Sequence, residues 1–214
     1  MTTVKFLLPT LIAIHLSSSL SYADKPSIDS IGVNIGYSKM VENFSTTGSI
    51  KNLEPNNNFT SAEIYMMLRD VFPDSTYRPT LNYIYSTNSN LTNQSLLIGL
   101  NKYFIRKNSS LYLGLLAGYG ELKWDKSYID STLKNDLIAN SIVYGAQVGL
   151  DAPVSEHISL NINVKYLLHD YTMDVEYTPT NTASYDHKST TNISVGLKYS
   201  FYVNHNIAGE NNEK

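Results

Sequence analysis

The histidines are the residues of this chain whose type could support acid–base or metal chemistry, because imidazole titrates near neutral pH and is a common metal ligand. There are five of them, His15, His157, His169, His187 and His205. Asp170 and Asp186 stand next to the third and fourth, so one region holds two imidazoles and two carboxylates. However, no ligand spacing such as HExxH occurs. We therefore interpret His169 and His187 as solvated loop residues, and we expect no metal, no cofactor and no catalytic residue.

The composition excludes several classes of protein. The chain has 214 residues, no cysteine and a formal net charge of −3. Without cysteine it can form no disulfide, thiolate zinc site or cysteine nucleophile. Without a basic block it cannot neutralise many phosphates, so we expect no nucleic-acid partner. Only 16% of the residues are charged, whereas about 25% are charged in an ordinary soluble domain.

Residues 1–23 have the layout of a secretory signal peptide. Lys5 supplies the positive start, and residues 6–16 form an apolar run. Ser21 and Ala23 place small side chains at positions −3 and −1 of a cleavage site after Ala23. The run is shorter than the roughly 20 apolar residues of a membrane-spanning helix. We therefore predict an exported protein whose mature chain begins at Asp24.

Apolar and polar residues alternate with period two through the mature chain. In residues 191–201, for example, Ile193, Val195 and Leu197 alternate with Ser194, Gly196 and Lys198. Such alternation predicts a strand with one apolar and one polar face. The same pattern predicts eight strands, at residues 31–38, 61–68, 77–85, 96–101, 111–120, 142–150, 158–168 and 191–201.

The predicted connections alternate between long and short. The long ones, at residues 45–58, 86–94, 125–139 and 169–190, are rich in Asn, Ser, Thr and Asp. The short ones, at residues 69–76, 105–110 and 151–157, carry turn formers such as Asp151 and Pro153. This layout is typical of an outer-membrane barrel, whose short turns face the periplasm. An even number of strands then predicts that both termini are periplasmic.

Two observations predict that the apolar face points outward, into lipid. An eight-stranded barrel has an interior only just wide enough for side chains, and the bulky apolar residues are too many to fit inside it. Aromatic residues also stand at the predicted strand ends, as in the interfacial girdles of membrane barrels. We place Tyr37, Tyr85, Tyr119, Trp124 and Tyr166 at the loop end, and Tyr103, Phe104, Tyr199 and Phe201 at the turn end.

A family resemblance follows from two segments. Residues 193–201 look like the closing strand of bacterial outer-membrane proteins, and residues 114–120 carry Gly114, Gly118 and Gly120 in an apolar stretch. With the eight strands, residues 28–201 resemble the small outer-membrane barrel family that includes the OmpA membrane domain and the opacity-type porin-like proteins. The resemblance implies that Tyr199 and Phe201 form the signal read by the outer-membrane assembly machinery. The polar tail, residues 202–214, is too short for the peptidoglycan-binding domain of OmpA-like relatives, so no wall anchoring is implied.

The predicted lumen face carries four charged residues, Glu63, Arg78, Lys165 and Lys198. Unpaired buried charges are costly, so we interpret the four as a paired network that fills the barrel, with a narrow ion path as the alternative. Lys39 and Lys102 fall on the apolar face near strand ends, where they can snorkel to the interface. Pro79 does not fit the pattern, because it lacks the N–H that a closed ladder needs.

The sequence therefore predicts an all-β, eight-stranded antiparallel up-and-down transmembrane β-barrel over residues 24–201, monomeric and in contact with outer-membrane lipids. We expect a non-enzymatic function, either envelope structure or contact with host or matrix ligands through the loops. The alternatives are a channel of small conductance or a lipid-A-modifying enzyme, a class that occurs among barrels of this size. No catalytic motif for the latter is present.

Overall fold

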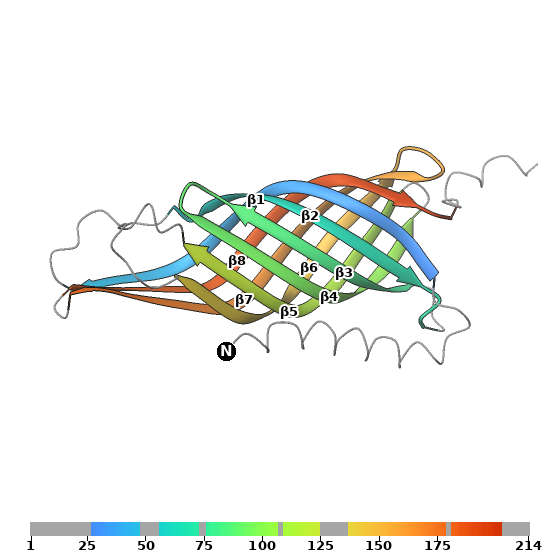
Figure 1. Ribbon diagram of the computed structural model, residues 1–214. Helices are drawn as coiled ribbons and strands as arrows, with labels where there is room; N and C mark the ends of the chain where they lie inside the picture. The colour runs from blue at the N-terminus through green and yellow to red at the C-terminus, as the bar shows by residue number, and fades with distance from the viewer. Residues whose placement is uncertain are drawn as a thin grey trace, which may run out of the picture.

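The computed structural model describes residues 27–47, 56–72, 76–106, 109–124, 137–178 and 181–202. The predicted signal peptide and residues 203–214 of the predicted tail lie outside them. Eight antiparallel strands follow one another in sequence order and form a closed barrel (Figure 1). They are β1 (Ser27–Thr47), β2 (Asn58–Arg69), β3 (Tyr77–Thr87), β4 (Leu91–Arg106), β5 (Ser109–Trp124), β6 (Ile138–Pro153), β7 (Ile158–Thr178) and β8 (Asn181–Ser200).

The first and last strands close the barrel by pairing along almost their whole length, from Ser30 opposite Ser200 to Thr47 opposite Thr182. The prediction of an eight-stranded up-and-down barrel is therefore confirmed. No helix among the described residues is long and apolar enough to cross a membrane.

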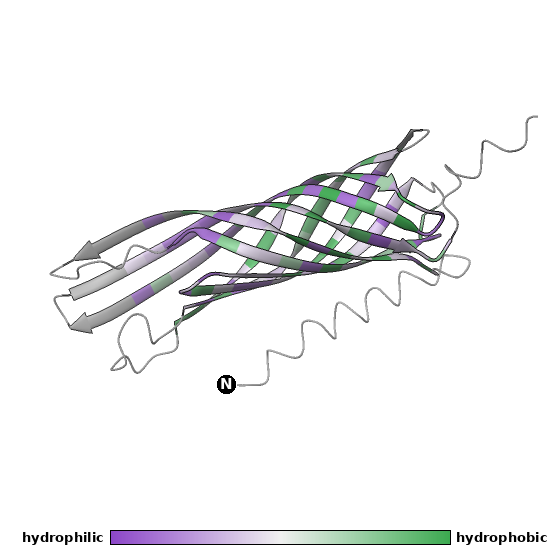
Figure 2. Cartoon of the chain, turned by 90° about the horizontal axis from the view of Figure 1, so that it is seen from above, coloured by the Kyte–Doolittle hydropathy of each residue, from purple (hydrophilic) through white to green (hydrophobic). Residues whose placement is uncertain are grey.

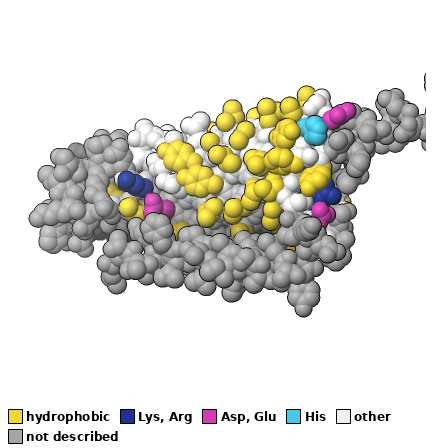
Figure 3. All heavy atoms as spheres, turned by 45° about the vertical axis from the view of Figure 1, so that its right-hand side comes forward, with side chains coloured by type: hydrophobic (Ala, Val, Ile, Leu, Met, Phe, Trp, Pro, Cys, Tyr) yellow, Lys and Arg dark blue, Asp and Glu magenta, His cyan; other side chains and the backbone are white. Residues whose placement is uncertain are grey.

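The outer surface of the barrel carries an apolar band, as the alternation predicts. Residues that point outward at mid-strand are strongly exposed, with Ile35 at 70%, Leu115 at 71% and Ile142 at 72%. Apolar side chains gather over the middle of the molecule in the space-filling view (Figure 3). The apolar band comprises Ile31, Val33, Ile35, Ile64, Leu81, Leu96, Ile98, Leu113, Leu115, Ile142, Val148, Ile162, Val164, Ile193, Val195 and Leu197.

The strands are longer than predicted, so part of the expected loop structure is wrong. The region 169–190 is not a loop: β7 runs to Thr178, β8 begins at Asn181, and the two pair from Ile158 opposite Tyr199 to Thr178 opposite Asn181. Likewise only three residues separate β3 from β4. We call the end with the connections 48–57, 88–90, 125–137 and 179–180 the loop end, and the opposite end, with connections 70–76, 107–108 and 154–157, the turn end.

Strands β1, β7 and β8 continue past the others at the loop end, and there the pattern of polarity inverts. On β7, Asp170 and Thr172 point outward, whereas Tyr171 and Met173 are buried inside. Figures 1 and 2 show these three strands projecting from the barrel. Within the apolar band the same strand does the opposite, with Ile162 and Val164 outside and Asn163 buried inside. The strand therefore has the side-chain pattern of a lipid-facing barrel in one part and of a water-facing one in the other.

The interfacial girdle is partly confirmed. Tyr37, Tyr85, Tyr119 and Tyr166 point outward at the loop end of the band, and Phe104, Tyr199 and Phe201 point outward at the turn end. The predicted placement of Trp124 and Tyr103 in the girdle is wrong. Trp124 is fully buried inside, and Tyr103 points inward to bond Asp151. Both lie on the inward-facing register of their strands, whereas outward Lys102 and Lys123 flank them.

Pro79 is accommodated at the end of a ladder. Strand β3 pairs with β4 through Pro79 opposite Leu100, but its pairing with β2 stops at Thr80 opposite Met67. Pro79 thus lies one residue beyond the β2 ladder, at the end of a strand where a proline is tolerated. Lys39 and Lys102 are both exposed on the outer face, as predicted.

Candidate functional site

An ion pair crosses the barrel interior from β2 to β7. Lys165 Nζ lies 2.8 Å from Glu63 Oε2, and both side chains are almost completely buried. Lys165 also donates to Asn163 Oδ1 at 2.6 Å, and Asn34 Nδ2 donates to the same Glu63 oxygen at 2.8 Å. These additional bonds satisfy part of the hydrogen-bonding capacity of two desolvated charges, which a buried ion pair requires.

A chain of amide side chains connects this pair to a second one nearer the turn end. Asn163 Nδ2 donates to Asn161 Oδ1 at 2.8 Å, and Asn161 Nδ2 donates to Asp151 Oδ1 at 2.7 Å. Asp151 Oδ2 pairs with Lys198 Nζ and accepts from the Tyr103 hydroxyl at 3.0 Å. Alternate inward positions along β7 place their polar groups one above the other, so a continuous polar network joins the two ion pairs.

Asp151 is an interior residue that the sequence reasoning missed. We placed it in a turn because Pro153 follows closely, but β6 continues to Pro153 and carries Asp151 inward. The signal was present, since Asp151 continues the inward register of Gln147 and Gly149. The fourth predicted lumen charge, Arg78, is only half-buried at the turn end, where its Nε lies 3.8 Å from Asp29 Oδ1.

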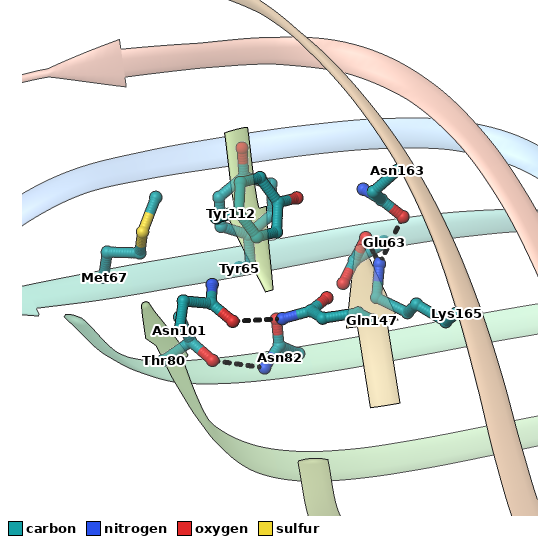
Figure 4. Close-up of a pocket in the computed structure, with 10 residues that line it drawn as sticks. All are labelled: Glu63, Tyr65, Met67, Thr80, Asn82, Asn101, Tyr112, Gln147, Asn163 and Lys165. Carbon is teal, nitrogen blue, oxygen red and sulfur yellow. Dashed lines mark hydrogen bonds and ion pairs between the residues drawn. The ribbon is translucent and has the colours of Figure 1, made fainter. Parts of the chain in front are cut away.

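A small cavity lies beside the Glu63–Lys165 pair, and we call it the polar chamber (Figure 4). Its lining includes Glu63, Tyr65, Asn101, Tyr112, Gln147 and Lys165, which come from five strands of the barrel. Gln147 Nε2 donates to Asn101 Oδ1 at 2.7 Å across it. Two glycines make the arrangement possible, because a Cβ at Gly32 would overlap the ring of Tyr65 and one at Gly149 the ring of Tyr112.

The loop end of the interior is apolar. We call its buried cluster the apolar cap. The rings of Trp124 and Tyr185 pack edge-to-face inside it, with centroids 4.2 Å apart. The same contiguous cluster continues toward the middle of the barrel through Leu97, Leu116 and Val143. The apolar cap comprises Met40, Phe59, Leu91, Leu122, Trp124, Leu137, Tyr171, Met173 and Tyr185.

His169 and His187 lie beside this cap, and the interpretation of both as solvated is wrong. They point inward from β7 and β8 at the level where the outer face is already polar, and both are buried. His169 Nδ1 lies 3.0 Å from the His187 carbonyl oxygen, and its Nε2 lies 2.8 Å from Thr190 Oγ1. Burial lowers the pKa of each histidine from its usual 6.5 to about 4.

The flanking carboxylates turn away from the histidines. Asp170 binds Lys188 on the outer face, and Asp186 accepts from Thr172 Oγ1 at 2.8 Å. Successive strand residues point to opposite faces, which separates each aspartate from its neighbouring histidine. Within the described ranges, no three His, Asp or Glu side chains gather as a metal site would need.

The predicted assembly-signal residues stand at the outer edge of the turn end. Tyr199 and Phe201 are half exposed, with their rings edge-to-face at a centroid distance of 5.4 Å. His157 holds the end of β8 from the neighbouring turn, with Nδ1 2.9 Å from the Ser200 carbonyl oxygen. Tyr202, which we assigned to the tail, also contacts the barrel, since its hydroxyl donates to Ser27 Oγ at 3.1 Å.

Comparisons with known proteins bear on the fold. No family model matches the chain, and no curated protein is similar to it in sequence. The crystal structure of Neisserial surface protein A matches with a TM-score of 0.59 and 16% identity, over 83% of this chain and 100% of that one. The outer-membrane protein OprG of Pseudomonas aeruginosa matches with a TM-score of 0.47 and 12% identity, over 80% of this chain and 96% of that one.

The attachment invasion locus protein Ail of Yersinia pestis matches with a TM-score of 0.43 and 13% identity, over 81% of this chain and 100% of that one. We base the assignment on the first match, whose TM-score exceeds 0.5, together with the closed barrel and its exposed apolar band. The chain therefore has the fold of the small eight-stranded outer-membrane β-barrel proteins.

Proposed function

We propose that this barrel acts through the surface that it presents at the loop end, as a surface-interaction protein without enzymatic activity. The observation that carries the proposal is the inversion of polarity along β7, where Tyr171 and Met173 turn inward and Asp170 and Thr172 outward. A strand gains nothing from continuing beyond the lipid unless a folded, water-facing structure is needed there. The apolar cap gives that structure a core of its own.

The apolar cap also favours a surface function over conduction. Leu97, Leu116 and Val143 are buried on inward positions in the middle of the barrel. An ion that left the polar network toward the loop end would meet these apolar side chains, which offer it no ligands. An eight-stranded barrel has in any case only enough interior space for its own side chains. A channel of small conductance is therefore a weaker candidate function than interaction through the surface at the loop end.

A lipid-A-modifying enzyme is also a weaker candidate than a surface-interaction protein. Such chemistry needs a nucleophile or base that faces the substrate at the membrane rim. His169 and His187 are the histidines nearest the loop-end rim, and both point into the barrel rather than toward lipid. Their lowered pKa follows from burial, not from a carboxylate partner that would make one of them a base.

The location of the protein follows from the same proposal. We infer that residues 1–23 are removed during export, that the barrel lies in the outer membrane and that the turn end with both termini faces the periplasm. The refolded mature chain should require detergent or lipid and should migrate faster on gels unheated than boiled. A chain that stays monomeric and soluble without detergent would contradict the lipid-facing role of the apolar band.

The proposed function is tested by shortening the hairpin that β7 and β8 form beyond the other strands at the loop end. Residues 175–183 would be replaced by Asn-Gly, so that Asp174 and Ser184, which pair in the structure, remain opposite each other. Cells that display the shortened barrel should lose adherence to host cells or matrix proteins relative to cells with the intact barrel. A matched control carries Ser155→Ala in the β6–β7 turn at the other end. Equal adherence of all three, with equal surface levels, would reject the proposal.

A further inference from the structure

Strands β6 and β7 separate near the loop end, although they are neighbours in the barrel. Their pairing stops at Tyr144 opposite Leu168, whereas both strands continue beyond this pair toward the loop end. Among the described residues there, a single hydrogen bond joins the two strands, from the Asp170 N–H to the Ser141 hydroxyl oxygen at 2.8 Å. Beyond Leu168, β7 is therefore paired along one side only, with β8.

The other side of this part of β7 is an open sheet edge. In an antiparallel ladder, alternate residues direct their N–H and C=O groups to opposite sides of the strand. The Asp170 N–H points away from β8, toward Ser141. Thr172 and Asp174 follow at every second position, so their N–H and C=O groups also face away from β8. We call this part of β7, residues 170–178, the β7 edge.

The β7 edge is accessible from water. An open sheet edge is the surface to which an extended polypeptide adds as a further strand. Asp170, Thr172 and Asp174 are exposed on the outer face, beyond the apolar band. Strand β1 borders the opposite side of the sheet that projects at the loop end (Figure 1). That border is less open, because the Met40 N–H at its start already donates to the Asn57 carbonyl oxygen at 2.9 Å.

The charge of the β7 edge selects the partner. The edge contains Asp170, Asp174 and Glu176 but no Lys or Arg. Asp170 already pairs with Lys188 of β8. A second copy of this chain would bring the same acidic residues to the contact, and like charges opposite each other on adjacent strands are destabilising. A strand that carries Lys or Arg would instead form favourable cross-strand pairs with the carboxylates.

We propose that the β7 edge binds an extended, basic segment of another protein, which adds as a strand beside β7. This inference rests on the proposed surface-interaction function and names the class of partner for it. Main-chain hydrogen bonds with Thr172 and Asp174 hold the added strand, and its basic side chains pair with the Asp174 carboxylate on the outer face. The same carboxylates keep the edge from pairing with a second copy.

The test measures peptide binding to the refolded mature barrel in nanodiscs of phosphatidylcholine, a lipid without net charge. The probe is a fluorescent peptide of alternating Lys and Thr, followed by fluorescence anisotropy. We expect saturable binding that weakens as salt is added. A matched peptide of alternating Glu and Thr should not bind. A Lys–Thr peptide with every backbone nitrogen methylated keeps its charge but has no N–H to donate, and its binding should be lost.

Hydrogen exchange and two variants locate the bound peptide. The Lys–Thr peptide should slow exchange at the Thr172 and Asp174 amides and leave those of Tyr171 and Met173, which face β8, unchanged. Thr172→Pro removes one N–H at an edge position, where proline is tolerated, and should weaken binding. Thr172→Val also removes the hydroxyl but keeps the N–H, so it should bind the peptide as the wild type does.

Three results would overturn the proposal. Equal binding of the three peptides would show that strand pairing and charge play no part. Slow exchange of the Thr172 amide before any peptide is added would show that the chain itself covers the β7 edge. Association of the barrel with itself in the absence of peptide would assign a second copy as the occupant. The peptide series decides the matter even if Thr172→Pro fails to fold.

The proposed function can fail or hold independently of this inference. A barrel that supports adherence of cells but does not bind the Lys–Thr peptide would reject the basic strand as its partner and leave the surface function standing. A barrel that binds the peptide through Thr172 and Asp174, in cells whose adherence does not depend on the hairpin, would confirm the β7 edge as a docking surface and reject the role in adherence.

Discussion

Lys165 and Glu63 form a buried ion pair between strands that are not neighbours in the barrel, although 102 positions separate them in the chain. Glu63 lies on β2 and Lys165 on β7, so the pair spans the lumen and ties two walls together. Because both charges are desolvated, the effect of removing one partner differs from the effect of removing both.

Lys165→Met should destabilise the barrel by about 3–5 kcal/mol, because it leaves the Glu63 carboxylate buried without its counter-charge. The double variant Glu63→Gln with Lys165→Met should recover most of that loss, since no unpaired charge remains. Urea titration of the barrel refolded into lipid vesicles measures both free energies of unfolding. Equal losses in the single and double variants would show that the pair is not desolvated as the structure has it.

Leu113→Arg tests the apolar band. Leu113 points outward at mid-strand with 50% of its surface exposed, and a charge at that depth should cost roughly 2–4 kcal/mol in lipid. Asn140→Arg is the matched control, because Asn140 is exposed on the outer face of β6 beyond the band. The free energy of unfolding in vesicles should fall for the first variant alone. Similar values for the two would refute the assignment of the outer surface to lipid.

The buried histidines predict a loss of cap stability in acid. Burial lowers the pKa of His169 and His187 to about 4, so the opened form binds more protons than the closed form between pH 6.5 and 4. The free energy that holds the cap closed should therefore fall as the pH decreases through this window and stay constant above it.

Trp124, the one tryptophan of the chain, reports on this change because it lies in the cap against Tyr185. Its fluorescence should shift as the pH falls through the window in the wild type and remain steady when His169 and His187 are both changed to Gln. His157→Gln, at the opposite end of the barrel, serves as the control and should behave as the wild type. A shift that persists in the double variant would place its cause elsewhere.

The closing strand predicts two contrasting variants. Changing Tyr199 and Phe201 together to Ser should leave the protein in the periplasm, because it removes the aromatic pair that the family resemblance assigns to the assembly signal. Deleting residues 203–214 should leave insertion intact. The deletion spares Tyr202, whose ring lies beneath the Arg69 guanidinium at 3.9 Å. Fractionation of the outer membrane distinguishes the two. Normal insertion of the double Ser variant would show that these two side chains are not the assembly signal.

The sequence alone determined the number of strands, their order and the outward direction of the apolar face within the band. Each depends on local alternation, since the direction of Leu113 or Ile193 follows from the period of its own strand. The same rule predicted that Glu63, Lys165 and Lys198 point away from the apolar face. In contrast, the partner of Glu63 depends on the closure of the barrel, which brings β2 opposite β7, and the partner of Asp151 depends on the pairing of both β6 and β8 with β7. No local pattern contains that information.

The tertiary structure alone decided where the strands leave the lipid. Along β7 the residues from Asp170 onward still alternate, but the apolar ones face inward because water replaces lipid outside. With only the outward apolar pattern as a guide, Tyr171 and Met173 resemble loop residues, and Trp124 resembles a member of the lipid-facing girdle. The meaning of an apolar residue in a strand depends on which solvent lies outside it, and that solvent changes along one continuous strand.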